Sequence, residues 1–272
     1  MSEATSGNGP KGTAVVTGAS AGIGKVYANR LAARGYDLIL VARRGDRLAD
    51  VAAPLREQFG VKVESVVADL ANPADLEKVA TKIADDASVT LLVNNAGTAT
   101  FGPVAQTELG AIDAMNDVNL TALVRLSRAV LPGFKTRDHG TLINIGSVLG
   151  FAALQFSTVY SGTKAYVQFF TRGLQTEVAG SNVRVQLVCP AATATDLWEI
   201  SGVPVTRLDP ATVMTSENMV DAALAGLDLG EAVTLPSVEN PAPLLAAYEA
   251  AAGAVLASSQ NGKPASRYKI AG

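Results

Sequence analysis

The stretch Thr17-Gly18-Ala19-Ser20-Ala21-Gly22-Ile23-Gly24 follows a short apolar run, residues 13–17, and precedes an amphipathic segment, residues 23–34. A strand, a glycine-rich turn and a helix in this order predict the first unit of a parallel α/β sheet. In such a turn, free amides at the helix N-terminus favour an anion, and glycines let a phosphate approach the backbone. The glycine spacing departs from the usual G-x-G-x-x-G. The stretch alone therefore leaves a dinucleotide site and a merely tight turn both open.

The rest of the chain continues the alternation of β-rich runs and amphipathic segments. The expected strands are residues 13–17, 37–42, 62–68, 90–94, 141–145, 183–188 and 232–235, and the expected helices are residues 23–34, 46–59, 74–85, 109–131, 157–179 and 217–227. Gly35, Gly60 and Gly180 follow three of these helices as stop signals, and Pro54 is expected to kink or split the second helix. The order predicts an α/β fold of the Rossmann type, a doubly wound, parallel seven-stranded sheet in a single domain with helices on both faces.

The two ends of the chain differ from this pattern. Residues 1–12 are small and polar, which predicts a disordered leader. Residues 13–239 are expected to form the dinucleotide-binding and catalytic domain, and residues 240–272 a C-terminal helical extension and tail.

Two scarce residue types restrict the chemistry. The 272 residues include one cysteine, Cys189, and one histidine, His139. A single cysteine cannot form an internal disulfide or a cysteine-rich zinc site, and it suits a reducing compartment. Sites that need two or three imidazoles are excluded as well, so we expect no metal. The chemistry must use Ser, Tyr, Lys, Asp, Glu and backbone groups, or a cofactor.

Charge and hydropathy argue against two classes of partner. Lys and Arg number 22 against 25 acidic residues, with no long basic block, so nucleic acid binding has no electrostatic support. The mean hydropathy is +0.24. However, the longest apolar stretch, residues 244–258, contains Glu249 and is shorter than the ~20 residues that span a bilayer. We expect a cytoplasmic protein with neither a membrane nor a nucleic acid partner.

Residues 18–22 also match the nucleophile elbow G-x-S-x-G, with Ser20 as nucleophile, which raises the alternative of a serine hydrolase. That class needs a histidine after an acid and an oxyanion-hole loop earlier in the chain. The chain offers His139 alone, in a turn-like segment before a strand, and residues 13–17 alone precede the elbow as structure. The sequence therefore disfavours this alternative.

Three polar residues point to proton transfer. Tyr160 and Lys164 are four positions apart on a predicted helix, so their side chains share one face. Ser147 follows the strand at residues 141–145, at the carboxyl edge where ligands bind in α/β sheets. A tyrosine acts as acid and base near neutrality if its pKa falls from ~10 towards 7, which takes ~4 kcal/mol. One ammonium at ~4 Å in a partly screened site supplies about that much. The alternative is a helix-surface pair.

Together these residues resemble the short-chain dehydrogenase/reductase family over about residues 13–195. The matching segments are residues 17–24, Asp69, residues 94–97, Asn119, Ser147, residues 160–164 and residues 190–195, in the family's order and spacing. Each motif alone is weak, whereas the set is specific. The chain departs from the family at Ala191, where glycine is usual, and in its C-terminal extension.

The resemblance implies a role for each catalytic residue. Tyr160 gives a proton to a carbonyl oxygen during reduction, or removes it during alcohol oxidation. Ser147 holds that oxygen by a hydrogen bond. Lys164 lowers the pKa of Tyr160 and binds the nicotinamide ribose, and Asn119 fixes a water that relays protons. The implied cofactor contacts are Gly18, Ser20, Ala21, Gly22, Ile23, Gly24, Arg43, Arg44, Asp69, Leu70, Asn95, Ala96, Gly97, Tyr160, Lys164, Pro190, Ala191, Thr193 and Thr195.

The end of the second strand predicts which nicotinamide cofactor binds. A member that prefers NAD carries an acid there, whereas this chain has Ala42 followed by Arg43. An acid would repel a 2′-phosphate, and a guanidinium binds it in a fork. We predict NADP(H), with Arg43 as the main contact and Ser20 or Arg44 helping, although a solvated arginine pair is the alternative.

The predicted function is that of an NADP(H)-dependent oxidoreductase acting on CH–OH groups, which interconverts an alcohol with a ketone or aldehyde, 3-oxoacyl compounds included. The expected substrate contacts are Ser147, Leu149, Gln155, Tyr160 and Trp198, and residues 193–216 resemble the family's substrate lid. Apolar lining favours an apolar small-molecule substrate. The alternatives are a non-catalytic NADP(H)-binding sensor and a dehydratase or epimerase of the extended branch. The resemblance also implies a homodimer or homotetramer, formed through the helices at residues 109–131 and 157–179.

Overall fold

The computed structural model describes residues 11–270, so most of the expected leader at residues 1–12 lies outside the described residues. The chain divides into two compact units, one that ends at Pro236 and one that begins at Ser237.

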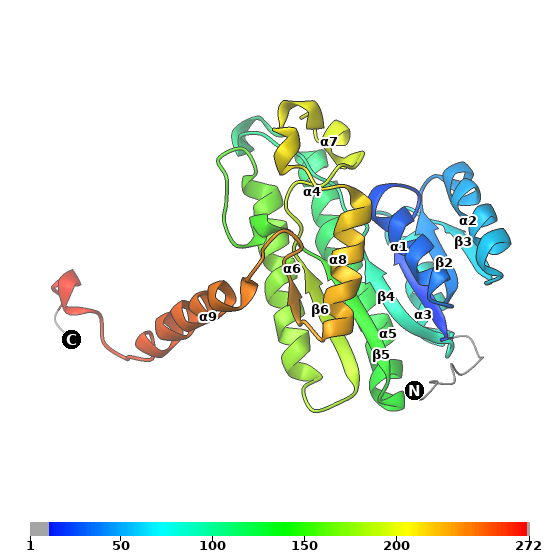
Figure 1. The fold of residues 1–272 in the computed structure, drawn as a ribbon. Coiled ribbons are helices and arrows are strands. Elements are labelled where there is room, and N and C mark those ends of the chain that lie inside the picture. Colours follow the sequence, from blue (N-terminus) through cyan, green and yellow to red (C-terminus); the bar gives the residue numbers. More distant parts are fainter. Residues whose placement is uncertain (1–10, 271–272) are drawn as a thin grey trace. The chain divides into compact units, whose positions relative to one another are not determined.

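The first unit contains a seven-stranded parallel sheet, which confirms the predicted fold class (Figure 1). Its strands are β1 (Thr13–Thr17), β2 (Asp37–Ala42), β3 (Val63–Val67), β4 (Val89–Asn94), β5 (Gly140–Ile145), β6 (Val183–Val188) and β7 (Val233–Thr234). Their order in space is β3-β2-β1-β4-β5-β6-β7. The chain builds outward from β1 to β3, then returns to β4 and builds outward on the other side. The carboxyl ends of β1 and β4 therefore form the point of reversal where such sheets bind ligands.

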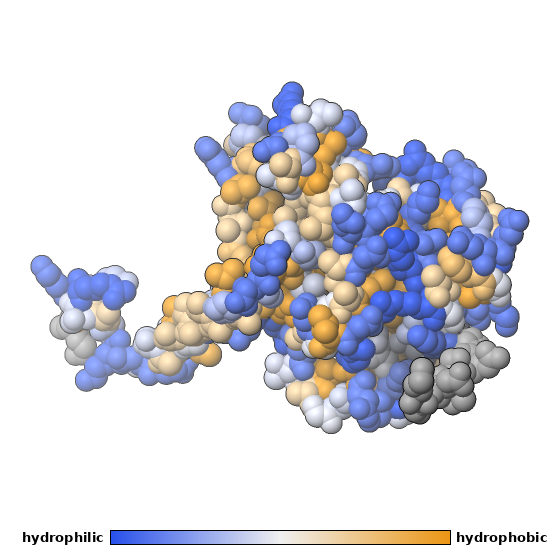
Figure 2. Space-filling model, viewed as in Figure 1, coloured by the Kyte–Doolittle hydropathy of each residue, from blue (hydrophilic) through white to orange (hydrophobic). Residues whose placement is uncertain are grey.

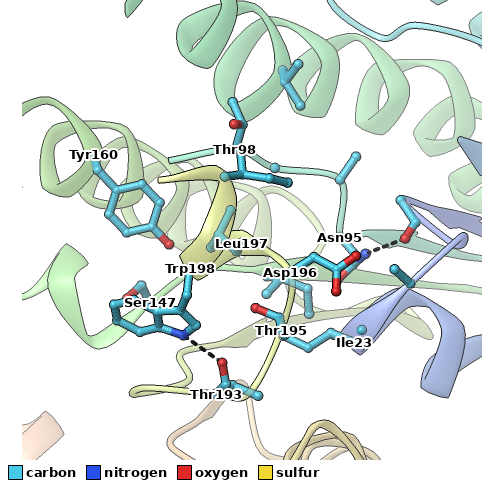
Figure 3. A pocket seen from close by; sticks show the side chains of 18 of the residues that line it. Ile23, Asn95, Thr98, Ser147, Tyr160, Thr193, Thr195, Asp196, Leu197 and Trp198 are labelled. Carbon is cyan, nitrogen blue, oxygen red and sulfur yellow. Dashed lines mark hydrogen bonds between the residues drawn. The ribbon is translucent and has the colours of Figure 1, made fainter. Parts of the chain in front are cut away.

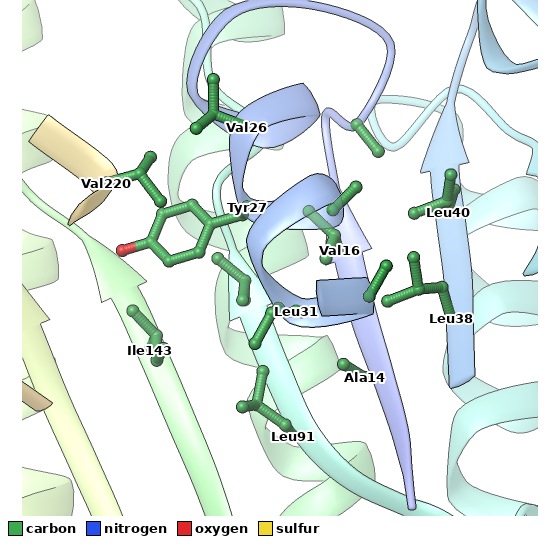
Figure 4. Packing of buried hydrophobic residues seen from close by; sticks show 14 of the residues in the cluster. Ala14, Val16, Val26, Tyr27, Leu31, Leu38, Leu40, Leu91, Ile143 and Val220 are labelled. Carbon is green, nitrogen blue, oxygen red and sulfur yellow. The ribbon is translucent and has the colours of Figure 1, made fainter. Parts of the chain in front are cut away.

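Helices cover both faces of the sheet. On one face the core includes residues of α1 (Gly22–Ala33), α2 (Gly45–Phe59) and α8 (Ser216–Leu229), and on the other those of α3 (Pro73–Asp85), α5 (Leu123–Arg137) and α6 (Thr158–Glu177). The strands alternate between the two cores: Val16 packs under α1, and the adjacent Val15 packs in the opposite cluster. Figure 4 shows Tyr27 and Leu31 of α1 lying over the sheet beside Val16. This burial on both faces explains why the central strands β1, β2 and β4 are apolar almost throughout, whereas the edge strand β3 is largely exposed.

Two prolines lie inside helices, and the structure bears on what was expected at each. Helix α2 continues through Pro54 without a split, and α5 continues through Pro132 to Arg137 instead of ending at residue 131. Each proline deprives one carbonyl of its helical donor. Because Pro54 and Pro132 are both exposed, that carbonyl can be hydrated, which lowers the cost of a proline inside a helix.

The helix expected at residues 109–131 is composite. It consists of α4 (Leu109–Asn116), a π-helical segment η2 (Asp117–Ala122) and the first part of α5. A π-helical turn inside a helix often marks a functional site, and this one contains Asn119.

Short helical turns, none of them predicted, follow three strands at their carboxyl ends. They are η1 (Val104–Gln106), η3 (Val148–Gly150), α7 (Leu197–Ile200), η4 (Val205–Arg207) and η5 (Pro210–Thr212). The last three belong to the predicted lid, whose base is closed by backbone hydrogen bonds between Ala192, Ala194 and Met214.

The second unit contains α9 (Pro241–Ser258) and the short turn η6 (Ser266–Tyr268). Helix α9 buries none of its residues, and it exposes Leu244, Val255 and Leu256, so that its visible surface is mainly apolar in Figure 2. Among residues 11–270, no helix is both long enough and apolar enough to cross a membrane.

Candidate active site

A cavity of about 660 Å³ opens at the carboxyl edge of the sheet (Figure 3). It runs from the glycine-rich turn after β1, past the ends of β4 and β5, to the lid after β6. The predicted site residues that line it are Gly18, Ser20, Ala21, Gly22, Ile23, Arg43, Arg44, Asp69, Leu70, Asn95, Ala96, Gly97, Ser147, Leu149, Tyr160, Lys164, Pro190, Ala191, Thr193, Thr195 and Trp198. The structure thus brings the glycine-rich turn and the three candidate catalytic residues to one cavity. Gly24, Asn119 and Gln155 are not among the lining residues.

The glycine-rich turn needs glycine for two different reasons. Gly18 and Gly22 have φ angles of +67° and +49°, a region that other residues rarely adopt. Gly24 has ordinary dihedral angles, but a Cβ there would overlap the carbonyl of Gly18. Helix α1 begins at Gly22, and Ala21 at its N-cap supplies no side-chain acceptor. The first amides of α1 thus keep no cap of their own and face the side where an anion would bind.

Asn95 braces this turn instead of projecting its side-chain amide into the cavity. Its Nδ2 donates to the Thr17 carbonyl at 2.8 Å. The backbone amides of Asn95 and Ala96 donate to the Thr17 hydroxyl at 3.0 and 2.9 Å. These bonds tie the end of β4 to the end of β1.

Ser147, Tyr160 and Lys164 meet at the other end of the cavity. Ser147 lies two residues after β5, and its Oγ accepts from the Leu149 amide at 3.1 Å. Tyr160 lies in the first turn of α6, and its hydroxyl points into the cavity in Figure 3. Lys164 follows one turn later, and its Nζ donates to the Ile145 carbonyl at 2.9 Å and lies 5.7 Å from the centre of the Tyr160 ring.

Burial has the largest effect on the pKa values of both Tyr160 and Lys164. It raises the pKa of Tyr160 to about 12, against a smaller lowering by the Ser147 hydroxyl, and it lowers the pKa of Lys164 to about 8. In this structure the Lys164 ammonium is bonded to a backbone carbonyl and not to the phenol oxygen. That Lys164 lowers the pKa of Tyr160 stays a prediction.

Asn119 is buried behind the cavity. Its Oδ1 accepts from the Thr98 amide at 2.9 Å, and its Nδ2 donates to the Thr98 carbonyl at 3.0 Å and to Thr163 Oγ1 at 3.1 Å. These bonds join the segment after β4 to α6. A Cβ on Gly97 would lie 3.3 Å from Asn119 Oδ1 and 3.9 Å from Lys164 Nζ, so Gly97 keeps both polar groups close to the backbone.

Aromatic side chains form the wall beside Tyr160. The ring of Phe101 lies 5.5 Å from that of Tyr160, 5.8 Å from that of Phe156 and 5.9 Å from that of Trp198, centre to centre. Trp198 Nε1 donates to the Thr193 carbonyl at 2.8 Å (Figure 3). This wall makes the end of the cavity beside Tyr160 apolar, the end where a substrate is expected.

Basic and acidic side chains lie at the opposite end, beyond β2. Arg43 is exposed and makes no hydrogen bond or ion pair with any of residues 11–270. Arg44 Nη2 donates to Ser20 Oγ at 3.4 Å and lies 3.8 Å from Asp196 Oδ2. Asp69 Oδ1 accepts from the Ala71 amide at 3.0 Å, the pattern of a turn after a strand.

The family model for short chain dehydrogenases matches residues 12–202, which include the lining residues of this cavity from Gly18 to Ile200 but not Val203, Leu208 and Thr212. The chain belongs to the short-chain dehydrogenase family. A curated member, the very-long-chain 3-oxoacyl-CoA reductase of Anas platyrhynchos, is 36% identical over 69% of this chain and 62% of its own length. The chain therefore spans less than two thirds of that relative.

Two solved members of the family are similar over nearly the whole chain. The short-chain dehydrogenase from Sphingobium yanoikuyae, solved with NADPH, is 43% identical, with a TM-score of 0.90, over 94% of this chain and 100% of its own. The bulky-bulky ketone specific alcohol dehydrogenase from Comamonas testosteroni is 37% identical, with a TM-score of 0.85, over 94% and 98%.

The geometry also bears on the serine hydrolase alternative. Ser20 lies in the turn after the carboxyl end of β1, whereas His139 directly precedes the first residue of β5. Because the strands are parallel, these two residues lie at opposite ends of the sheet. The structure gives Ser20 no histidine base, in keeping with a short-chain dehydrogenase.

Sequence reasoning placed one substrate residue wrongly and missed others. Gln155 is exposed and does not line the cavity, because a turn closed by the Ser157 amide and the Leu154 carbonyl directs Leu154 and Phe156 inward in its place. Ala114 and Val118 line the cavity as well. Their spacing of four, just before Asn119, is the signal that could have found them.

Proposed function

We propose that this chain is an NADP(H)-dependent oxidoreductase that interconverts a bulky apolar ketone or aldehyde with the corresponding alcohol. The observation that carries the proposal is the meeting of Ser147, Tyr160 and Lys164 at one cavity that continues to a glycine-rich turn. A serine and a tyrosine hydroxyl beside a buried cation suit a substrate oxygen that gains and loses a proton.

The residues present fit a dinucleotide. A Cβ on Gly18 would lie 2.8 Å from Asn95 Nδ2, and one on Gly24 would overlap the turn, so the backbone at the start of α1 is bare and close to the cavity. The amides at that helix N-terminus would hold the pyrophosphate, and Lys164 would hold the nicotinamide ribose. The bound nicotinamide supplies the hydride.

The chain's own residues then handle the oxygen and its proton. Because burial keeps the pKa of Tyr160 high, its phenol is protonated at neutral pH and can donate to a carbonyl oxygen. Ser147 can donate a second hydrogen bond to that oxygen, which strengthens as negative charge develops. The aromatic wall around Phe101 excludes water from the substrate end.

Three observations support NADP(H) over NAD(H). The residue that ends β2 is Ala42, so no carboxylate is present there to bind a ribose 2′-hydroxyl. Arg43 lines the cavity with a guanidinium that is not engaged by residues 11–270, and it can bind a 2′-phosphate in a fork. The Sphingobium yanoikuyae relative was solved with NADPH.

The lining of the substrate end supports an apolar carbonyl compound. Its residues are Phe101, Leu149, Leu154, Phe156, Trp198, Ile200, Val203 and Leu208. The names of the relatives supply two substrate classes to compare, ketones with two bulky substituents and 3-oxoacyl thioesters. The lack of a basic side chain in this lining favours the uncharged ketones.

The test is NADPH consumption over a panel of bulky apolar ketones, aldehydes, 3-oxoacyl thioesters and phosphorylated sugars. We expect turnover of the bulky ketones, and a loss of about 10²- to 10⁴-fold in Tyr160→Phe with NADPH binding retained in calorimetry. Tyr166→Phe, on the exposed side of the same helix, is the matched control and should keep full activity.

Three results would count against the proposal. Activity on phosphorylated sugars alone would overturn the substrate class. Undiminished turnover in Tyr160→Phe would remove the proposed proton donor. Tight NADPH binding with no turnover of any compound would favour the sensor module instead.

A further inference from the structure

Asp196 joins two sides of the cofactor end of the cavity. Its Oδ2 lies 3.1 Å from Arg47 Nη1 and 3.8 Å from Arg44 Nη2. Asp196 belongs to the lid after β6, whereas both arginines belong to the start of α2. We call the contact among Asp196, Arg44 and Arg47 the clasp. Since Arg44 and Asp196 both line the cavity, the clasp lies across its rim.

The position of Asp196 in the lid lets the clasp hold the lid against α2. Asp196 is the N-cap of α7, where an aspartate usually accepts from the first amides of its own helix, but it makes no such bond. Its carboxylate pairs with α2 instead. The base of the lid is pinned at residues 192–194 and 214–216, so the clasp holds the free part of the loop against α2.

The start of α2, on one side of the clasp, carries positive charge that attracts anions. Arg43, Arg44 and Arg47 gather where the helix dipole of α2 adds positive charge. Asp196 pairs with two of these guanidiniums, and Arg43 stays unengaged among residues 11–270. The side chains of the clasp are about half exposed, at 43%, 48% and 55%. Exposed ion pairs are weak, so an anion of higher charge can replace the carboxylate.

We propose that the 2′-phosphate of NADP(H) displaces Asp196 from Arg44 and Arg47 and thereby releases the lid. This inference rests on the proposed function, because it needs a cofactor with a phosphate at that place. NAD(H) brings no such anion and leaves the clasp closed. Asp196 is thus a positioning residue that couples the choice of cofactor to the opening of the substrate end.

The chain contains its own reporter of the lid. Trp198 is its single tryptophan and lies two residues after Asp196, on α7. Its indole is half-buried, bonded to the Thr193 carbonyl and packed beside Phe101. Release of the lid would expose the indole to water, which shifts its fluorescence to longer wavelengths.

The experiment follows Trp198 fluorescence while 2′,5′-ADP or 5′-AMP is added, with binding measured in parallel by calorimetry. We expect 2′,5′-ADP to shift the emission of the wild type to longer wavelengths and 5′-AMP to leave it unchanged. Asp196→Asn should show the shifted emission without ligand and bind 2′,5′-ADP about two- to fivefold more tightly, as the loss of exposed ion pairs implies. Arg47→Met, which retains Arg44, should show the same shifted emission without ligand as Asp196→Asn. Asp46→Asn, which removes an equal charge from the first turn of α2, should emit like the wild type.

Each remaining outcome decides between the two proposals. If 2′,5′-ADP binds the wild type without changing the emission, or if both Asp196→Asn and Arg47→Met emit like the wild type, the clasp does not restrain the lid. The proposed function then stands. If 2′,5′-ADP binds no more tightly than 5′-AMP, the preference for NADP(H) itself is wrong and the inference falls with it.

Discussion

Lys164→Met should stabilise the folded chain at pH 7, even though Lys164 belongs to the proposed catalytic set. The Lys164 side chain is buried, and burial lowers its pKa from 10.5 to about 8. This difference corresponds to about 3 kcal/mol of unfavourable free energy while the amine is charged. Methionine has a similar length and no charge, but it leaves the Ile145 carbonyl without its donor, which costs about 1 kcal/mol. We expect the free energy of unfolding to rise by about 2 kcal/mol.

The advantage of the variant should shrink as the pH rises. The folded chain loses the Lys164 proton near pH 8, whereas the unfolded chain keeps it until about 10.5, so the unfolded state binds more protons between these values. The stability of the wild type gains from this group as the pH rises through that window. The gap between wild type and Lys164→Met should therefore narrow by about 1 kcal/mol between pH 7 and pH 9. Cys189, whose pKa burial raises to about 12 and Lys164 lowers in part, stays protonated up to pH 9 in both folded proteins, so its contribution cancels.

Urea unfolding at pH 7, 8 and 9 measures both effects, with Lys25→Met as the control. Lys25 is exposed on α1, so its removal should change neither the stability at pH 7 nor its pH dependence by more than about 0.5 kcal/mol. The reasoning is refuted if Lys164→Met is less stable than the wild type at pH 7 and the difference stays constant to pH 9. Such a result would mean that the site solvates the ammonium and that its burial costs little.

Further substitutions test the cofactor end and the packing of the sheet. Gly24→Ala places a Cβ against a carbonyl of the preceding turn, so NADPH affinity in calorimetry should fall by more than about tenfold, or ~1.4 kcal/mol. Gly173→Ala, in open space on α6, should instead stabilise by up to about 1 kcal/mol in urea unfolding. Arg43→Asp should lower kcat/KM for NADPH by at least about tenfold and spare NADH, because a carboxylate repels a 2′-phosphate; equal losses with both cofactors would contradict the assignment. Gly140→Ala drives a Cβ into the ring of Phe134, so urea unfolding should show a loss of about 1–3 kcal/mol.

A structural feature could be predicted from the sequence when its physical cause lies in neighbouring residues. The central strands were predictable because strands buried on both faces are apolar almost throughout, whereas β3 is largely exposed and contains Glu64 and Ser65. The positive φ angles of Gly35, Gly60 and Gly180 confirm the predicted helix stops. Continuation of a helix through Pro132 was not predicted, because it depends on whether the freed carbonyl meets water. That is a property of the packed molecule.

The same distinction applies to the site. Tyr160 and Lys164 lie on one helix, so their proximity follows from a spacing of four. Arg47 pairs with Asp196, which lies 149 positions away in the sequence, and no local sequence pattern predicts this pairing. The direction in which Gln155 points is set by a four-residue turn after β5. Periodicity carries no information there, since the segment is neither helix nor strand.

The positions of Lys164 and Tyr160 have a consequence for the direction of the proposed reaction. Reduction of a carbonyl needs a protonated tyrosine, and a phenol whose pKa is about 12 meets that need at neutral pH. Oxidation of an alcohol needs the phenolate, which burial disfavours while the Lys164 ammonium is bonded to the Ile145 carbonyl. For oxidation, the ammonium must therefore turn from that carbonyl towards the phenol oxygen, so that a nearby positive charge offsets the burial of the anion. The arrangement in this structure, with the ammonium bonded to the Ile145 carbonyl, thus favours the protonated phenol that reduction needs.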